Sequence, residues 1–334
     1  MTVEMIQVSP RVQAPPPVPA QPVQAWRDIF YTARDGLRLY ARHYPQGAAP
    51  TASHRPAARP VVCLAGLTRN SRDFHDLAMA LSPARDVYAL DYRGRGRSEY
   101  DSDWRNYTPY FETLDVLDFM TLHGLHDTTV IGTSRGGIIA MIMGTVRPGA
   151  IGAVVLNDIG PVIQANGLIR IVGYVGRIPL PKDWPEATRL VREISRRDFP
   201  AITEAMWRDI AHQSFDDVNG QPGASYDTGL SRAFSLTEVA KGVPTMWPQF
   251  MTLARVPVLV IRGENSDILT PRTVQEMAAR HPQFTSITVP GQGHAPFLKD
   301  RETIQSVLTF LAGADATHHA RTTAPFPASM TPRV

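Results

Sequence analysis

One ten-residue stretch, residues 128–137, constrains this chain more than any other part of its sequence. It reads Thr-Thr-Val-Ile-Gly-Thr-Ser-Arg-Gly-Gly, so a β-branched run breaks into the pattern Gly-x-Ser-x-Gly around Ser134. An apolar, helix-forming segment, 138–146, follows at once. Gly132 and Gly136 leave room for the backbone to double back, because neither carries a Cβ atom. The stretch therefore predicts a strand, a tight turn that exposes a nucleophilic serine, and a helix.

Gly-x-Ser-x-Gly also arises by chance in glycine-rich turns, so the assignment of Ser134 depends on a base and an acid elsewhere in the chain. An apolar run at 257–261 predicts a buried strand, and the loop after it carries Asp267 before a Thr-Pro helix start. A later predicted strand, 285–289, is followed by a glycine-flanked loop that carries His294. We expect His294 to act as the base and Asp267 to orient it.

With these motifs in this order, the chain resembles the α/β-hydrolase superfamily, and in particular its capped serine esterase and lipase-like branch. The resemblance runs from Trp26 to about Ala312. It implies an α/β fold with a mostly parallel eight-stranded sheet flanked by helices, and a helical cap inserted after the sixth strand. Some branches of this fold take the acid from the strand after the nucleophile turn, so Asp158 is the alternative to Asp267.

Residues 61–68, Val-Val-Cys-Leu-Ala-Gly-Leu-Thr, resemble the strand and loop that carry the oxyanion motif of this family. Ala65 stands where the family usually has His or Pro, so the match is one of position. The resemblance implies that the backbone N–H groups of Leu67 and Arg135 form the oxyanion hole. We expect the side chain of Arg135 to make a buried structural ion pair rather than to contact an anionic substrate.

Residues 87–98 hold three arginines within five positions and resemble the Asp-x-Arg-Gly-x-Gly-x-Ser segment of the family. The resemblance implies that Arg93, Arg95 and Arg97 pair with nearby carboxylates and carbonyls. The glycine spacing here matches neither a phosphate-binding loop nor a dinucleotide site, so we expect no phosphate site.

Composition excludes several classes of partner. The 334 residues carry a formal net charge of only +3, without a basic cluster interleaved with aromatic residues, so we expect no nucleic-acid binding. No apolar run reaches the length of a membrane span. The single cysteine, Cys63, leaves no internal disulfide, and no Cys/His cluster has zinc spacing. We expect no metal and no organic cofactor, and the sequence leaves a homodimer open.

The composition changes along the chain divide it into four parts. We predict a disordered Pro-rich arm at 1–25, a core at 26–160 and 254–312, a helical cap at 161–253 and a flexible tail at 313–334. The arm lacks the basic start and apolar segment of a secretion signal, so we expect a cytoplasmic protein. The cap interval lacks strand patterns and holds helical ones, at 168–177, 184–197, 202–213 and 236–253.

Three aromatic residues are candidates for the wall of a substrate pocket. Phe74 follows the predicted oxyanion loop, and Trp207 and Trp247 lie in the predicted cap. The alternative is that the two tryptophans pack the cap against the core, because aromatic residues at helical spacing serve both purposes.

Together these residues predict hydrolysis of carboxylic esters with small or medium acyl groups through an acyl-enzyme intermediate, with a small-molecule ester as the partner. The same triad supports lactone opening, carbon–carbon bond hydrolysis, perhydrolysis and acyl transfer. Dehalogenases and epoxide hydrolases of this fold carry Asp in place of Ser134. A receptor-like ligand-binding scaffold is the alternative from another class, but it has no need of an intact triad.

Overall fold

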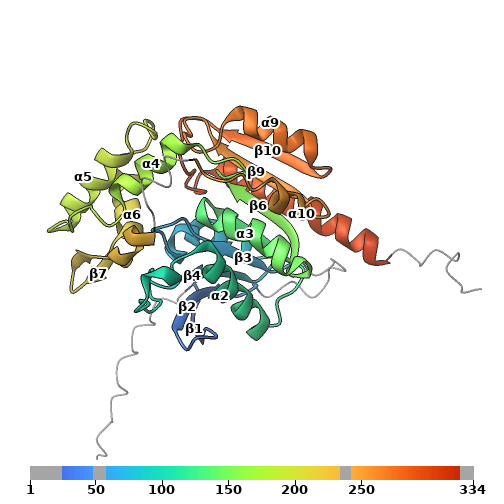
Figure 1. Cartoon of the computed structure of the whole chain (residues 1–334), viewed down its shortest axis with the longest axis horizontal. Helices are drawn as coiled ribbons and strands as arrows, with labels where there is room; N and C mark the ends of the chain where they lie inside the picture. Colours follow the sequence, from blue (N-terminus) through green and yellow to red (C-terminus); the bar gives the residue numbers. More distant parts are fainter. Residues whose placement is uncertain (1–24, 48–57, 234–241, 324–334) are drawn as a thin grey trace, which may run out of the picture.

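The computed structural model describes residues 25–47, 58–233 and 242–323. Its centre is an eight-stranded sheet with the strand order β1-β2-β4-β3-β5-β6-β9-β10 (Figure 1). β2 pairs antiparallel with β1 and β4, and the other neighbours run parallel. This confirms the predicted mostly parallel sheet. The strands are β1 (Arg27–Thr32), β2 (Arg38–Tyr44), β3 (Val61–Leu64), β4 (Val87–Asp91), β5 (Thr128–Thr133), β6 (Ile151–Asn157), β9 (Val258–Gly263) and β10 (Phe284–Val289).

The inner parallel strands are mostly apolar because both of their faces are covered, and every residue of β3, β6 and β9 is buried. In β3, alternate side chains enter two separate core clusters: Val62 and Leu64 belong to one, and Val61 and Cys63 to the other. Successive side chains in a strand point to opposite faces, so each cluster marks one face of the sheet.

Helices cover both faces (Figure 1). Val116 of α2, Ile139 of α3 and Met277 of α9 join the first cluster, whereas Leu77 of α1 and Val307 of α10 join the second. The sheet is therefore the middle layer of three. These helices are α1 (His75–Leu81), α2 (Pro109–Leu122), α3 (Arg135–Val146), α9 (Pro271–Arg280) and α10 (Arg301–Thr323), and the short 3₁₀ helices are η1 (Ser71–Phe74), η2 (Trp104–Asn106), η3 (Pro148–Ala150) and η4 (Thr228–Ala233).

A mainly helical insertion separates β6 from β9, as the sequence predicts. Its helices α4, α5 and α6 gather at one end of the molecule, together with a small hairpin (Figure 1). Only the short α8 is helical within the described part of the predicted helix at 236–253; residues 234–241 lie outside the described ranges. The elements of the insertion are α4 (Ala165–Tyr174), α5 (Trp184–Ser195), α6 (Glu204–Ser214), β7 (Asp216–Val218), β8 (Gln221–Gly223), η4 and α8 (Trp247–Met251).

The hairpin β7–β8 corrects the expectation that the insertion holds no strands. Each of its strands is only three residues long, so no alternating pattern can build up in the sequence. Its turn carries the local signal instead. Asn219 and Gly220 both have positive φ, 54° and 83°, which is the conformation that an Asn-Gly hairpin turn requires.

The helix α10 extends into the interval predicted as a flexible tail, and that part of the prediction is wrong. Asp315 forms ion pairs with Arg59 and Arg85, two buried guanidinium groups that lie just before the inner strands β3 and β4, and these ion pairs hold the helix extension in place. Residues 324–334 of the predicted tail, and all but the last residue of the predicted arm, lie outside the described ranges. Within those ranges, no helix combines the length and apolar character needed to cross a membrane.

Candidate active site

Ser134 occupies the turn between β5 and α3 in a strained backbone conformation, with φ 50° and ψ −109°. Non-glycine residues rarely adopt positive φ, and they do so mainly where the surrounding structure enforces it. Here the surroundings leave no space for side chains. A Cβ atom at Gly132 would overlap the backbone of Gly136, and one at Gly136 would overlap the carbonyl of Leu64. The predicted strand, turn and helix around Ser134 are all present.

Ser134 and His294 lie within hydrogen-bonding distance of each other, as expected. The hydroxyl Oγ of Ser134 is 2.8 Å from Nε2 of His294, which follows β10. On the other side of the ring, Nδ1 of His294 is 2.7 Å from Oδ2 of Asp158. A carboxylate only accepts hydrogen bonds, so Nδ1 carries the proton and Nε2 is left to accept from the serine. The three side chains thus form one hydrogen-bonded chain.

The acid in this chain is Asp158, and the expectation that Asp267 orients His294 is wrong. The carboxylate of Asp267 instead accepts two hydrogen bonds from Arg170 of α4, at 2.7 Å from Nε and 2.8 Å from the terminal nitrogen. Burial alone would raise the pKa of Asp267, but the hydrogen bonds and charge of Arg170 outweigh it and hold the pKa below its usual value. Asp267 therefore joins the insertion to the core.

Three donors hold the carboxylate of Asp158, which is fully buried. Its Oδ1 accepts from the backbone N–H of Gly263 at 2.8 Å, and its Oδ2 accepts from the hydroxyl of Ser266 at 2.6 Å as well as from His294. A buried carboxylate is stable only with such partners. The signal in the sequence was an acid at the end of an otherwise apolar strand, whereas Ser266 carried no signal of its own.

Asn157 is a second residue that sequence reasoning missed. Its buried amide donates to the carbonyl of Pro296 at 2.9 Å and to the hydroxyl of Thr133 at 3.1 Å. The backbone carbonyl of Asn157 accepts from the backbone N–H of Ser134 at 2.9 Å. One residue at the end of β6 therefore ties the loop that carries the histidine to the turn that carries the serine.

The two residues expected to supply the oxyanion hole come from two different segments of the core. Leu67 is in the loop after β3 and lines the cavity described below. Arg135 is the first residue of α3, where backbone N–H groups point out of the helix. The predicted buried pairing of the Arg135 side chain is confirmed: Nε donates to Glu112 at 2.6 Å, and a terminal nitrogen donates to the carbonyl of Tyr107 at 3.1 Å.

A cavity of about 310 Å³ opens onto Ser134 and His294. The core supplies one side and the insertion the other, where apolar side chains predominate. Phe74 lines the cavity, as predicted. The insertion contributes, among others, Ile171, Tyr174, Leu180, Leu190, Val191, Ile194, Phe199 and Ile210.

Neither Trp207 nor Trp247 is among the lining residues, so their prediction as pocket residues is wrong. Trp207 is 3% exposed and packs in a cluster with Phe199 and Ile210, which themselves line the cavity. The ring of Trp247 packs on the core, with the guanidinium of Arg280 at 3.9 Å from its centroid. Trp247 thus packs the insertion against the core, the alternative considered for both tryptophans, whereas the cluster of Trp207 consists mainly of residues of the insertion itself.

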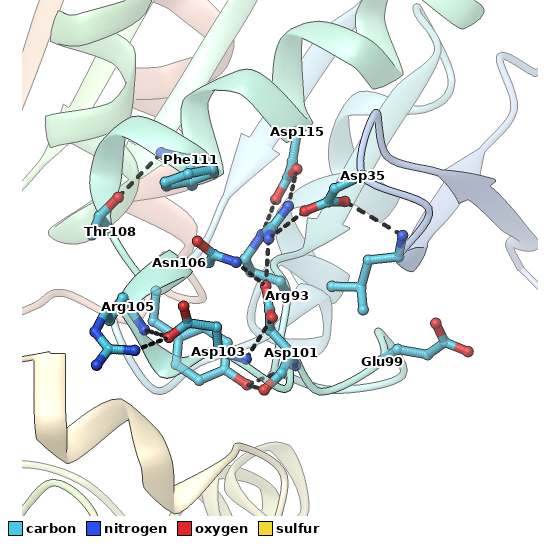
Figure 2. A network of polar contacts seen from close by, with 12 residues as sticks. Asp35, Arg93, Glu99, Asp101, Asp103, Arg105, Asn106, Thr108, Phe111 and Asp115 are labelled. Atoms are coloured by element: carbon cyan, nitrogen blue, oxygen red, sulfur yellow. Dashed lines mark hydrogen bonds and ion pairs between the residues drawn. The ribbon is translucent and has the colours of Figure 1, made fainter.

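The arginine-rich segment after β4 forms internal ion pairs, as the resemblance implies. Figure 2 shows Arg93 surrounded by the carboxylates of Asp35, Asp101 and Asp115. Arg97 pairs with Asp28 at the surface.

Within the described residues, no group of three or more His, Cys, Asp and Glu side chains is arranged to hold a metal ion.

Comparison with known proteins identifies the family. The sequence model of the alpha/beta hydrolase family matches residues 61–305. The chain belongs to this family. A crystal structure of an alpha/beta hydrolase from Novosphingobium aromaticivorans is 36% identical, superposes with a TM-score of 0.79, and covers 87% of this chain and 99% of its own.

Two relatives with named activities are hydrolases. A 3-hydroxybutyrate-oligomer hydrolase of Cupriavidus necator is 32% identical over 287 residues, which are 81% of this chain and 97% of that protein. An sn-1-specific diacylglycerol lipase of Mus musculus is 25% identical over 260 residues, which are 75% of this chain and 80% of that protein. These similarities support a hydrolase function for this alpha/beta hydrolase.

Proposed function

We propose that the chain is a serine-dependent hydrolase of carboxylic esters. The observation that carries the proposal is the hydrogen-bonded chain of Ser134, His294 and Asp158, of which Ser134 and His294 line a largely apolar cavity. A serine with a neutral imidazole at its hydroxyl and a carboxylate behind that imidazole is equipped for nucleophilic attack on a carbonyl carbon.

The proposed mechanism uses this arrangement of side chains. As Ser134 Oγ attacks the ester carbonyl, its proton passes to Nε2 of His294, and the N–H groups of Leu67 and Arg135 stabilise the negative charge on the carbonyl oxygen. Collapse of the tetrahedral intermediate expels the alcohol, which takes the proton from His294 and leaves an acyl-enzyme. Water then attacks the acyl-enzyme with His294 as base, and the carboxylic acid departs. Asp158 keeps the imidazole in the tautomer that both steps need.

The cavity supports esters of small or medium size. Its volume of about 310 Å³ is at the lower end of ligand pockets, and the insertion side is apolar enough to take an acyl chain of a few carbons. The named substrates of the two relatives, 3-hydroxybutyrate oligomers and diacylglycerols, are both carboxylic esters. Short 3-hydroxybutyrate oligomers are therefore the first natural esters to assay.

A fluorophosphonate probe tests the proposal, because it reacts with activated serines. We expect labelling at Ser134, found by peptide mass spectrometry, and turnover of p-nitrophenyl butyrate. Ser134→Ala should abolish both, with a loss on the order of a millionfold in turnover. Ser225→Ala removes another serine of the cavity wall and should leave the label at Ser134 in place. Turnover of Ser134→Ala within about tenfold of the parent would refute the mechanism.

A further inference from the structure

One buried carboxylate, that of Glu112, joins the two segments expected to form the oxyanion hole. Glu112 lies in the first turn of α2, and its side chain is fully buried. Its Oε2 accepts from Nε of Arg135 at 2.6 Å, and its Oε1 lies 2.8 Å from a terminal nitrogen of Arg95. Two guanidinium groups therefore bind opposite oxygens of the same carboxylate.

Arg95 links this carboxylate to the oxyanion loop. Its Nε donates to the carbonyl of Leu67 at 3.0 Å, and its other terminal nitrogen donates to the carbonyl of Arg93 at 2.6 Å. The side chain is completely buried, and its guanidinium lies near the ring of Tyr107, at 5.3 Å from the centroid. Arg95 therefore fixes the position of Leu67, whose N–H group is one of the two expected donors.

Arg135 links the same carboxylate to the start of α3. The N–H group of this residue is the other expected donor, and its side chain is fixed by Glu112 and by the carbonyl of Tyr107. The two donor residues are thus connected by three contacts, which join Leu67 to Arg95, Arg95 to Glu112, and Glu112 to Arg135. None of the hydrogen bonds and ion pairs on this path involves the side chain of Ser134 or His294.

The charges in this path favour one fixed arrangement. Burial by itself would raise the pKa of Glu112, but the guanidinium groups of Arg135 and Arg95 outweigh it and keep the pKa below its usual value. A buried carboxylate that loses either guanidinium is left with an uncompensated charge. Alternative positions of the two arginine side chains are therefore costly.

We propose that Glu112 is a positioning residue that sets the distance between the Leu67 and Arg135 amides, and hence the shape of the oxyanion hole. This inference rests on the serine-hydrolase function proposed above. Backbone donors stabilise the transition state only when they lie about 2.7–3.1 Å from the oxyanion. A displacement of about 1 Å at such a site costs roughly 100-fold in rate. Binding of the ground-state ester depends less on these donors, so the rate constant kcat should change more than KM.

Asp115 offers a matched control one helical turn further along α2. It is buried and binds a guanidinium, that of Arg93, through two hydrogen bonds of 2.7 Å. Arg93 also binds Asp35 and Asp101, so it keeps two carboxylates when Asp115 is changed (Figure 2). The two hydrogen bonds of Asp115 both go to Arg93, and neither involves Leu67 or Arg135. Asp115→Asn therefore disturbs a buried ion pair in the same helix and leaves both guanidinium partners of Glu112 in place.

The experiment compares Glu112→Gln and Asp115→Asn with the parent. It measures kcat and KM for p-nitrophenyl butyrate, inhibition by phenylboronic acid, which forms a tetrahedral adduct with an active serine, and the melting temperature. We expect Glu112→Gln to lower kcat about 10- to 100-fold and to weaken boronic-acid inhibition similarly, with KM within about twofold. Asp115→Asn should keep kcat within about twofold. A kcat for Glu112→Gln within about threefold of the parent, or an equal loss in Asp115→Asn, would overturn the proposal.

Arg95→Lys is the second variant, in case Glu112→Gln does not fold. Lysine keeps the positive charge but lacks the fork that holds Glu112 and the Leu67 carbonyl together. It should lower kcat with little change in KM, and an unchanged kcat would overturn the proposal. Failure of the proposed function is recognised separately: an active Ser134→Ala refutes serine catalysis, whereas an inactive Ser134→Ala with an unaffected Glu112→Gln refutes only the positioning role.

Discussion

Oδ2 of Asp158 lies 2.7 Å from Nδ1 of His294, although the strands that precede these residues are not neighbours in the sheet. Asp158 follows β6 and His294 follows β10, and β9 lies between the two strands. The loop after β9 contributes Asp267, which turns to Arg170 in the insertion. The carboxylate of the proposed triad therefore reaches past the adjacent strand.

The first prediction separates the two acids. Asp158→Asn should lower kcat about ten-thousandfold, because an amide can donate to Nδ1 and thus favour the wrong tautomer of His294. Asp267→Asn should cost less than about tenfold, because Asp267 contacts the insertion rather than the histidine. Steady-state kinetics with p-nitrophenyl butyrate measure both, with circular dichroism as the check on folding. A larger loss in Asp267→Asn would restore the sequence-based assignment.

The second prediction concerns Ser266. Its hydroxyl donates to Asp158 at 2.6 Å, so Ser266→Ala leaves the carboxylate with two of its three donors. Loss of one hydrogen bond to a charged group is worth about 1.5 kcal/mol, which corresponds to roughly a tenfold loss in kcat if the bond helps to hold Asp158 in place. Ser306→Ala, which removes an exposed hydroxyl bonded within α10, is the control. An unchanged kcat for Ser266→Ala would mean that Gly263 and His294 suffice to orient the acid.

The parts of the site that could be predicted are those fixed by local sequence. Ser134 was predictable because Gly132 and Gly136 are the residues that fit where the backbone folds back on itself. His294 was predictable because a glycine-flanked loop follows the last strand. Neither inference needs knowledge of a distant side chain.

The acid could not be predicted in the same way. Asp158 and Asp267 both lie beyond the carboxyl ends of adjacent strands, so topology places both of them near His294. Their side chains are directed by residues far away in sequence: Ser266 binds the first, and Arg170 of the insertion binds the second. An insertion helix has no sequence signal for the core residue that it will contact.

The same limit applies to Trp207 and Trp247. Helical spacing indicates that one face of a helix is apolar, but it does not distinguish a face that packs on the core from one that lines a cavity. In α5 the apolar residues that line the cavity are aliphatic: Leu190, Val191 and Ile194. The two tryptophans pack against other side chains instead, so choosing the largest aromatic residues of the insertion selected the wrong positions.

The third prediction follows from the lowered pKa of Asp267. Its usual value is 3.8, and Arg170 keeps the folded-state value below this. The charged carboxylate therefore stabilises the fold fully above about pH 3.8, and this contribution is lost as the pH falls through the folded-state pKa. Both side chains are about one third exposed, so the contribution is at most about 1 kcal/mol. The parent should melt about 2 °C above Asp267→Asn at pH 7.

That difference in melting temperature should shrink as the pH is lowered toward 3, and differential scanning fluorimetry over this range measures it. Arg170→Met should reproduce the pattern, because it removes the partner of the same carboxylate. A constant difference between pH 7 and pH 3 would show that the charge of Asp267 does not contribute, and that the amide disturbs packing instead.

The fourth prediction tests whether the apolar side of the cavity receives the acyl chain. Leu190 lines the cavity from α5, so Leu190→Trp should fill part of the space next to the insertion. Each methylene group of the acyl chain that can no longer be buried in the cavity costs about 0.8 kcal/mol of transition-state binding. Exclusion of two methylene groups therefore lowers kcat/KM about tenfold, and this loss should affect p-nitrophenyl hexanoate but not the acetate, which is too short to reach the site.

Arg189→Trp is the matched control, because Arg189 is the neighbouring position on α5 but is exposed and outside the cavity lining. It introduces the same side chain and should leave the ratio of the hexanoate and acetate kcat/KM values within about twofold of the parent. An equal fall for both esters in Leu190→Trp would indicate damage to the site as a whole. An unchanged ratio would mean that the acyl chain lies elsewhere in the cavity. Substitutions would then be made on the core side around Phe74, because Phe74 is the aromatic lining residue closest in sequence to the oxyanion loop.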